Sequence, residues 1–142
     1  MTDAVPRFLS TEEVGPSFER LTAAVAEFNN WVKLPRCPRL SPKLIIEFKP
    51  ESVWNDLNYA ESGLPGCYVF ENSEGELYYV GSVSANSGFG YRFANGYVGR
   101  DPADKSKIVR SGNAADSRRV YKVDVPKEHA FIAPALEQFL IS

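Results

Sequence analysis

Cysteine and histidine are scarce in this chain of 142 residues, which contains two cysteines and one histidine. Two cysteines are too few for a disulfide framework, and Cys37 and Cys67 lack the spacing of metal ligands. No apolar run approaches the ~20 residues that a membrane-spanning helix requires, so we expect no membrane association. The first residues, M-T-D-A-V-P-R-F-L-S, lack a basic segment followed by an apolar stretch. We therefore expect no secretory signal and a reducing, cytoplasmic location.

The chain also lacks a strong net charge, but its charged residues are unevenly distributed. The formal net charge is −2, and yet residues 88–122 contain eight basic side chains against three acidic ones. A basic segment on an acidic body is typical of a surface that faces a polyanion. It is equally typical of a solvated loop whose charges keep the protein soluble. Charge alone leaves both interpretations open.

Hydrophobic spacing predicts a helix near each end of the chain. Over residues 17–32, apolar side chains such as Leu21, Val25 and Phe28 recur at intervals of three and four. This amphipathic helix either covers the core or holds a partner protein. Residues 128–141 predict a second helix, in which Pro134 disfavours an interior position. That helix therefore either begins near Ala133 or is kinked there.

Between the helices, three segments have the composition of strands: residues 67–70, 77–83 and 120–125. Residues 44–48 are either a short strand or a buried connector. We expect a short helix around residues 89–95, and a polar loop over residues 101–117 with a helical stretch at 105–109. The order of elements predicts an α+β fold with a small, three-stranded, mainly antiparallel sheet flanked by helices.

The first two predicted strands form a hairpin around the turn sequence N-S-E-G. In the simplest register this turn has four residues, so that Tyr68 faces Tyr79 and Gly66 faces Gly81. The phenols of Tyr68 and Tyr79 then project from one side of the sheet. The other side receives Cys67, Val69, Tyr78 and Val80. A three-residue turn with a glycine bulge is the alternative, and it would offset this alignment.

The hairpin sequence G-C-Y, ten residues and Y-V-G resembles the signature of the GIY-YIG nuclease family. Two further residues follow in the order that the family shows. Arg92, in G-Y-R-F-A-N, lies where the family has its catalytic arginine. Glu137, in A-L-E-Q-F-L-I, lies where the family has a metal-binding glutamate on a later helix. The resemblance covers about residues 66–141.

The resemblance implies an endonuclease that hydrolyses DNA phosphodiester bonds with one Mg²⁺ or Mn²⁺ ion; RNA is left open as an alternative substrate. Tyr68 would act as the general base, and Tyr79 would position the nucleophilic water or the phosphate. Because a free phenol has a pKa near 10, the base needs a nearby cation. Arg92 would contact the scissile phosphate through its planar fork. Glu137 would ligate the metal ion, which prefers carboxylate oxygen.

The resemblance also gives the basic segment a meaning as a contact with the nucleic-acid backbone. Many family members carry a His or Tyr after the arginine, and Tyr97 is the candidate for that place. The residues that we expect to bind nucleic acid are Ser82, Tyr97, Arg100, Lys105, Lys107 and Arg110.

The resemblance divides the chain at residue 60. Residues 61–142 would form the GIY-YIG-like nuclease domain, and residues 1–60 an N-terminal helical extension and extended connector that pack on it. A catalytically inactive module of the same fold, which holds nucleic acid or a protein without cutting, is the alternative. Taken singly, Tyr68 and Tyr79 would more often be packing residues, because tyrosine is favoured in strands. The catalytic interpretation depends on the ordered set.

Overall fold

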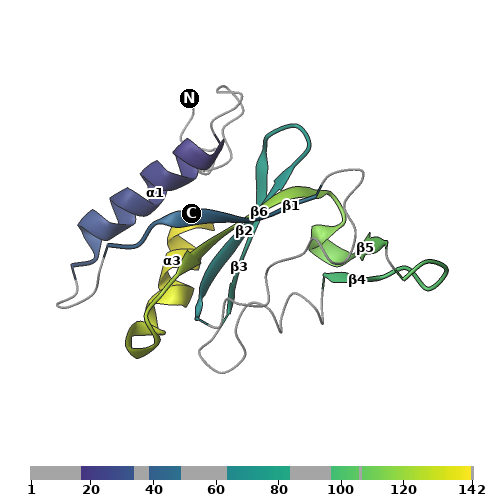
Figure 1. The fold of residues 1–142 in the computed structure, drawn as a ribbon. Coiled ribbons are helices and arrows are strands. Elements are labelled where there is room, and N and C mark those ends of the chain that lie inside the picture. Colours follow the sequence, from purple (N-terminus) through teal and green to yellow (C-terminus); the bar gives the residue numbers. More distant parts are fainter. Residues whose placement is uncertain (1–16, 34–38, 49–63, 84–96, 106, 142) are drawn as a thin grey trace.

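The structure is a computed structural model that describes residues 17–33, 39–48, 64–83, 97–105 and 107–141 (Figure 1). Its helices are α1 (Ser17–Trp31) and α3 (Ile132–Ile141), with short 3₁₀ turns η2 (Gly112–Ala114) and η3 (Lys127–His129). Its strands are β1 (Pro42–Glu47), β2 (Gly66–Asn72), β3 (Leu77–Val83), β4 (Val98–Arg100), β5 (Ile108–Arg110) and β6 (Ser117–Asp124). The α+β class predicted from the sequence is confirmed.

The main sheet is antiparallel and has four strands in the order β1-β6-β2-β3, so the prediction of three strands is wrong. The additional strand is β1, which covers most of the segment left open as a strand or a connector. It pairs with β6 from Pro42↔Val123 to Glu47↔Arg119, with an irregularity between Leu44 and Ile46. The pairing gives hydrogen-bonding partners to backbone groups along the outer edge of β6.

Both helices form where the hydrophobic spacing predicts them. In α1 the side chains of Leu21, Val25 and Phe28 are buried, as the intervals of three and four require. In α3 the first helical residue is Ile132, so Pro134 lies in the first turn, where the missing N–H has no intrahelical partner to lose. The helix therefore begins near Ala133, and the kinked alternative is excluded. No helix within the described ranges is long and apolar enough to cross a membrane.

A second, two-stranded sheet pairs β4 with β5, and it overturns the prediction of a helical stretch at residues 105–109. Ile108 and Val109 are β-branched, and they pair with Arg100 and Gly99 instead of continuing a helix. The helix expected around residues 89–95 lies outside the described residues. So does the proposed boundary at residue 60.

Buried side chains form two clusters, one on each face of the main sheet. The first lies between the sheet and the helices α1 and α3, and the β2–β3 hairpin contributes Cys67, Val69, Leu77 and Val80 to it. The second lies on the opposite face and is rich in aromatic rings, including Tyr68, Phe70 and Tyr97. Figure 1 shows α1 and α3 on one side of the sheet and the β4–β5 pair on the other. The fold thus places the signature tyrosines away from the helices.

Candidate functional site

The β2–β3 hairpin does not adopt the simplest register. Gly75 has a left-handed backbone (φ 82°), and the N–H of Asn72 donates to the carbonyl of Glu76 at 2.9 Å, which closes a three-residue loop. The register then shifts between Phe70 and Glu71, so that Tyr68 pairs with Gly81. The predicted pairing of Tyr68 with Tyr79 is therefore wrong, and the three-residue alternative is the one that forms.

The observed pairing differs from the predicted one by two residues. Because side chains alternate with a period of two, the two signature tyrosines still lie on one face of the sheet. The ring centroids of Tyr68 and Tyr79 lie 6.3 Å apart, which confirms the prediction that both project from the same side. Tyr78 was expected on the other face and is not there. It is the extra residue of the bulge, and its ring packs 6.1 Å from Phe70 in the aromatic cluster.

Gly81 provides the space in which the ring of Tyr68 lies. A Cβ atom built at Gly81 would come within 2.3 Å of Cζ and 2.4 Å of the hydroxyl oxygen of Tyr68. Gly66 was expected to face Gly81, and instead it pairs with Val83. There a Cβ atom would lie 2.0 Å from the carbonyl oxygen of Val123. The two motif glycines thus admit an aromatic ring at one position and a neighbouring backbone at the other.

Three phenols meet on this face of the hairpin. The hydroxyls of Tyr68 and Tyr97 lie 2.8 Å apart, and the hydroxyl of Tyr97 donates to that of Tyr79 at 3.5 Å. Tyr68 is 1% exposed and Tyr97 8%, whereas Tyr79 is only partly buried. Tyr97 was expected to bind nucleic acid in place of a histidine. In the structure it bridges the two signature tyrosines from the buried side.

The surroundings of Tyr79 favour its neutral form. The hydrogen bond that Tyr79 shares with Tyr97 raises the pKa of Tyr79, and burial and the negative charge of Glu137 raise it further. A general base at neutral pH needs the opposite shift.

Glu137 lies on α3 and reaches the edge strand β3 from the helical side of the sheet. Its Oε1 accepts a hydrogen bond from the hydroxyl of Ser82 at 2.8 Å. Ser82 follows Gly81 in β3, and neighbouring residues of a strand point to opposite faces. The phenols at Gly81 therefore lie on one face of the sheet and the carboxylate at Ser82 lies on the other. The two positions are consecutive residues of the edge strand. Ser82, expected to bind nucleic acid, is engaged with the proposed metal ligand.

The carboxylate of Glu137 is a chemically suitable ligand for a divalent cation. Glu137 is only partly buried, and the hydrogen bond from Ser82 occupies one of its two carboxylate oxygens. Mg²⁺ commonly uses one or two carboxylates and keeps several waters, so one glutamate is sufficient. Within the described ranges no group of three or more His, Cys, Asp or Glu could hold a metal ion. The donor set thus fits a partly hydrated hard cation better than a fully protein-ligated site.

The predicted phosphate contacts are spread over the second sheet and its turn. Arg92 lies outside the described residues, as does the side chain of Arg100. Lys105 and Lys107 are exposed in the turn between β4 and β5. Arg110 donates to the carbonyl of Ser117, and its guanidinium lies 4.9 Å from the ring centroid of Phe48. Arg110 is therefore partly occupied by contacts within the fold.

Among the described residues of the basic segment 88–122, some basic side chains are paired with carboxylates of the fold. Arg119 contacts the carboxylates of Glu47 at 3.2 Å and Glu71 at 3.4 Å. Lys122 is fully buried, and its ammonium group donates to Asp124 at 2.6 Å. Two of the eight basic side chains are thus neutralised inside the fold.

The sequence analysis did not identify two buried charged residues, Glu71 and Lys122. Glu71 accepts hydrogen bonds from Ser17 at 2.5 Å and Tyr121 at 2.6 Å, and these contacts join the start of α1 to the sheet. Lys122 lies directly opposite Tyr68 on β6. The alternation V-Y-K-V-D-V places Lys122 and Asp124 on one face. That pattern was a usable signal, since two opposite charges on the same face of a central strand are expected to pair.

Comparison with protein-family models, with curated proteins and with solved structures finds no match to this chain.

Proposed function

We propose that this protein is a divalent-metal-dependent endonuclease that hydrolyses phosphodiester bonds of DNA, with RNA as the alternative substrate, and that it acts in the cytoplasm. The observation that carries the proposal is the junction at the edge of β3. There the ring of Tyr68 lies over Gly81, and the next residue, Ser82, holds the carboxylate of Glu137. The phenols and the proposed hard-cation ligand thus lie at two consecutive residues of this edge strand, on opposite faces of the sheet.

Phosphodiester hydrolysis requires an activated water and compensation of the charge that develops on phosphorus. The water oxygen bonds to phosphorus, its proton passes to a base, and the bond to the leaving alkoxide breaks. Tyr79 is the phenol of this cluster that solvent reaches. We assign the role of base to the buried Tyr68, whose phenolate would take the proton through the hydroxyls of Tyr79 and Tyr97 once each has rotated to donate towards Tyr68. Arg92 takes the phosphate contact that the resemblance implies. A metal ion at Glu137 would supply positive charge to the phosphate and to the nearby phenols.

The experiment that tests the proposal is plasmid nicking with and without Mg²⁺. Glu137→Ala removes the carboxylate, and Tyr68→Phe removes one hydroxyl of the phenol cluster. We expect each change to lower the nicking rate at least ~100-fold, the lower range for loss of an acid–base group. The matched control is Glu74→Ala, which removes an exposed carboxylate from the hairpin turn. It should nick as the unchanged protein does.

A contaminating nuclease would be insensitive to these substitutions. Equal cleavage by the unchanged protein, Glu137→Ala and Tyr68→Phe would therefore contradict the proposal. Nicking that persists in excess chelator would contradict the metal requirement.

A module of the same fold that binds nucleic acid without cutting is the second candidate. Two observations favour it: Tyr68 is almost fully buried, and the pKa of Tyr79 is raised, first by its hydrogen bond with Tyr97. Both oppose the activation of a water at neutral pH. This candidate predicts salt-sensitive binding, no metal-dependent cleavage, and indifference of binding to Glu137→Ala.

A further inference from the structure

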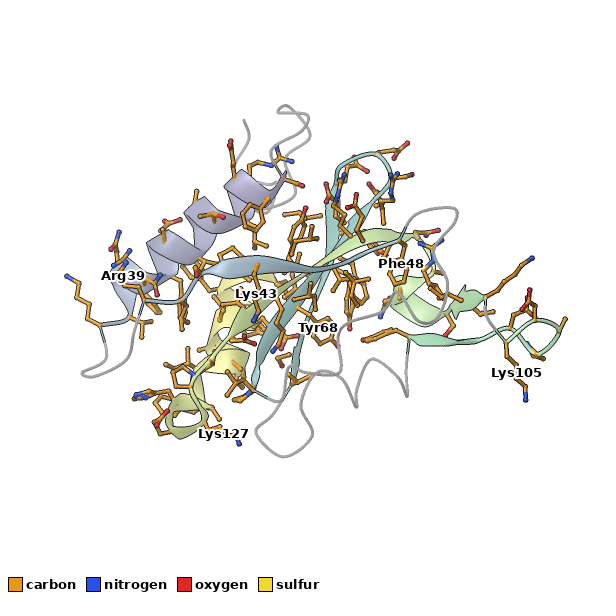
Figure 2. All side chains as sticks on the ribbon, in the orientation of Figure 1. Arg39, Lys43, Phe48, Tyr68, Lys105 and Lys127 are labelled. Carbon is orange, nitrogen blue, oxygen red and sulfur yellow. The ribbon has the colours of Figure 1, made fainter. Side chains whose placement is uncertain are left out.

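A cavity of about 640 Å³ opens where β1 begins and β6 ends. Three basic residues line it: Arg39, Lys43 and Lys127. They come from the segment that leads into β1, from β1 itself and from η3. Figure 2 labels all three side chains. None of the three belongs to the basic segment of residues 88–122, so the cavity is a cationic feature that the sequence did not reveal.

The cavity has an excess of positive charge. Its two acidic lining residues are Asp124 and Glu128. Asp124 is shared between two cations, since Lys43 contacts it at 2.7 Å and the buried Lys122 at 2.6 Å. Lys127 is exposed, and it has no side-chain hydrogen bond or ion pair within the described residues. An anion that enters the cavity therefore meets cations that the fold has not fully neutralised.

The wall of the cavity also contains apolar side chains, from Leu40, Leu64 and Pro126. The volume lies within the range of about 300–1,000 Å³ that is usual for small-molecule sites. A nucleotide combines a phosphate with a flat, largely apolar base. The mixed wall suits this combination better than it suits an inorganic anion.

A row of paired residues connects the cavity with the signature tyrosines. Lys43 pairs with Lys122 across β1 and β6, and Lys122 pairs with Tyr68 across β6 and β2. Directly opposite residues of an antiparallel sheet project from the same face. With strands spaced ~4.8 Å apart, Lys43 lies about 10 Å from Tyr68 along this row. The cavity and the signature tyrosines are thus two strand spacings apart.

The opposite end of the molecule offers a weaker alternative. Lys105 lies at the far end from Arg39 and Lys127 in Figure 2. A second cavity, of about 540 Å³, contains Arg110 and Arg118, but Glu74 and Asp116 balance these charges. Arg110 is also engaged with Ser117 and Phe48. The cationic excess therefore lies at the end of the sheet where β1 begins.

We propose that the cavity lined by Arg39, Lys43 and Lys127 binds a nucleoside phosphate of the nucleic-acid strand that is cut. The inference rests on the proposed function for its substrate class. The phosphate lies against the three basic side chains, and the base packs on the apolar wall. The same chemistry is shared by a nucleotide within a strand and by a free nucleoside monophosphate.

Binding is measured by fluorescence anisotropy of a labelled oligothymidylate, in Ca²⁺ and over a series of KCl concentrations. Lys127→Ala and Arg39→Ala remove exposed side chains, so neither is expected to affect folding, and circular dichroism checks this. We expect each change to weaken binding about 10-fold at low salt and to lower the salt slope by about 0.7. Lys105→Ala removes the same charge from the far end, and it should weaken binding less. Calorimetry with thymidine 5′-monophosphate separates the two sources of the phosphate.

If the monophosphate binds and Lys127→Ala abolishes its binding, the cavity accepts a terminal nucleotide. If only the oligonucleotide depends on Lys127 and Arg39, the cavity holds a phosphate within the strand. Both results support the inference. Binding that is unchanged in Lys127→Ala and Arg39→Ala overturns it, as does an equal loss in Lys105→Ala. Plasmid nicking tests the proposed function independently, since an unchanged protein that binds through the cavity without cutting would contradict only the nuclease proposal.

Discussion

The hydroxyl and ring of Tyr68 occupy the space in which a side chain at Gly81 would have to lie. A Cβ atom at Gly81 would approach Cζ of Tyr68 to 2.3 Å, and real Cβ contacts essentially never fall below 3.0 Å. Tyr68 and Gly81 are directly paired across β2 and β3. The spacing of tyrosine and glycine in the two motifs thus has a packing cause that is independent of catalysis.

Gly81→Ala should therefore destabilise the protein. The ring of Tyr68 is almost fully buried and has little room to move, so we expect a loss of about 2 kcal/mol in the free energy of unfolding. Urea denaturation measures this loss. In a Tyr68→Leu background the same substitution should cost less, since the smaller side chain leaves room for the methyl group.

Gly99→Ala is the matched control for this prediction. No heavy atom of the described residues lies within 4 Å of a Cβ atom built at Gly99, which is also in a strand. We expect it to leave the stability within about 0.5 kcal/mol of the unchanged protein. An equal cost for Gly81→Ala in both backgrounds would show that the ring of Tyr68 is not the obstacle.

Ser82→Ala should lower the affinity for Mg²⁺ more than it lowers the stability of the fold. The hydroxyl of Ser82 orients Glu137 through a single hydrogen bond of 2.8 Å. Removing such an outer partner of a metal ligand typically lowers metal affinity about 10-fold or more, whereas the stability cost is about 1 kcal/mol. The Mg²⁺ concentration for half-maximal nicking should rise accordingly.

Ser73→Ala, in the exposed hairpin turn, provides the comparison for Ser82→Ala. It should leave the Mg²⁺ dependence unchanged. If Ser82→Ala lowered the maximal nicking rate and left the half-maximal Mg²⁺ concentration unchanged, Ser82 would not act through the metal ligand.

Local patterns in the sequence predicted α1, α3, β2, β3 and β6, because each pattern reports on burial along one segment. They missed β4 and β5 and wrongly predicted a helical stretch at residues 105–109. The apolar spacing of residues 17–32 gave α1, and the apolar run at residues 44–48 left β1 open. Whether that run pairs with β6 depends on a segment that is distant in the sequence. A local pattern carries no information about such a partner. The three-stranded prediction failed for this reason.

The sequence predicted part of the arrangement of the candidate residues. Alternation within strands correctly placed Tyr68 and Tyr79 on one face. The contact between Ser82 and Glu137 joins residues 55 positions apart, so it follows from the docking of α3 on the sheet and not from spacing. The buried ion pair of Lys122 and Asp124 was overlooked because charged side chains are usually assigned to the surface.

The thiol of Cys67 should be unreactive in the folded protein. It is fully buried and lies 3.1 Å from the carbonyl oxygen of Ala133. Burial raises the pKa of the Cys67 thiol well above its usual range, and the charge of Glu137 raises it further. Since the thiolate is the reactive form, Ellman's reagent should modify a Cys37→Ser variant only when the protein unfolds. Rapid labelling without denaturant would contradict the burial of Cys67.

Asp124→Asn should destabilise the protein and remove an acid transition. Burial by itself would raise the pKa of Asp124, but hydrogen bonds from Lys122 and Lys43 outweigh it, so the pKa lies below its ordinary value of 3.8. A carboxylate with a lowered pKa contributes stability that is fully present above 3.8. That contribution is lost as the pH falls through the folded-state pKa. Melting temperatures of the unchanged protein should fall over this acid range more steeply than those of Asp124→Asn.

At neutral pH the cost of Asp124→Asn should be about 3 kcal/mol, because it leaves the buried ammonium group of Lys122 without its carboxylate. Lys122→Met in the same background removes the buried charge, and it should recover most of the loss. Replacing a buried ion pair with apolar groups of similar volume is often neutral or stabilising. If the double variant were no more stable than Asp124→Asn, the contact of Asp124 with Lys43 would have to carry the stabilisation instead.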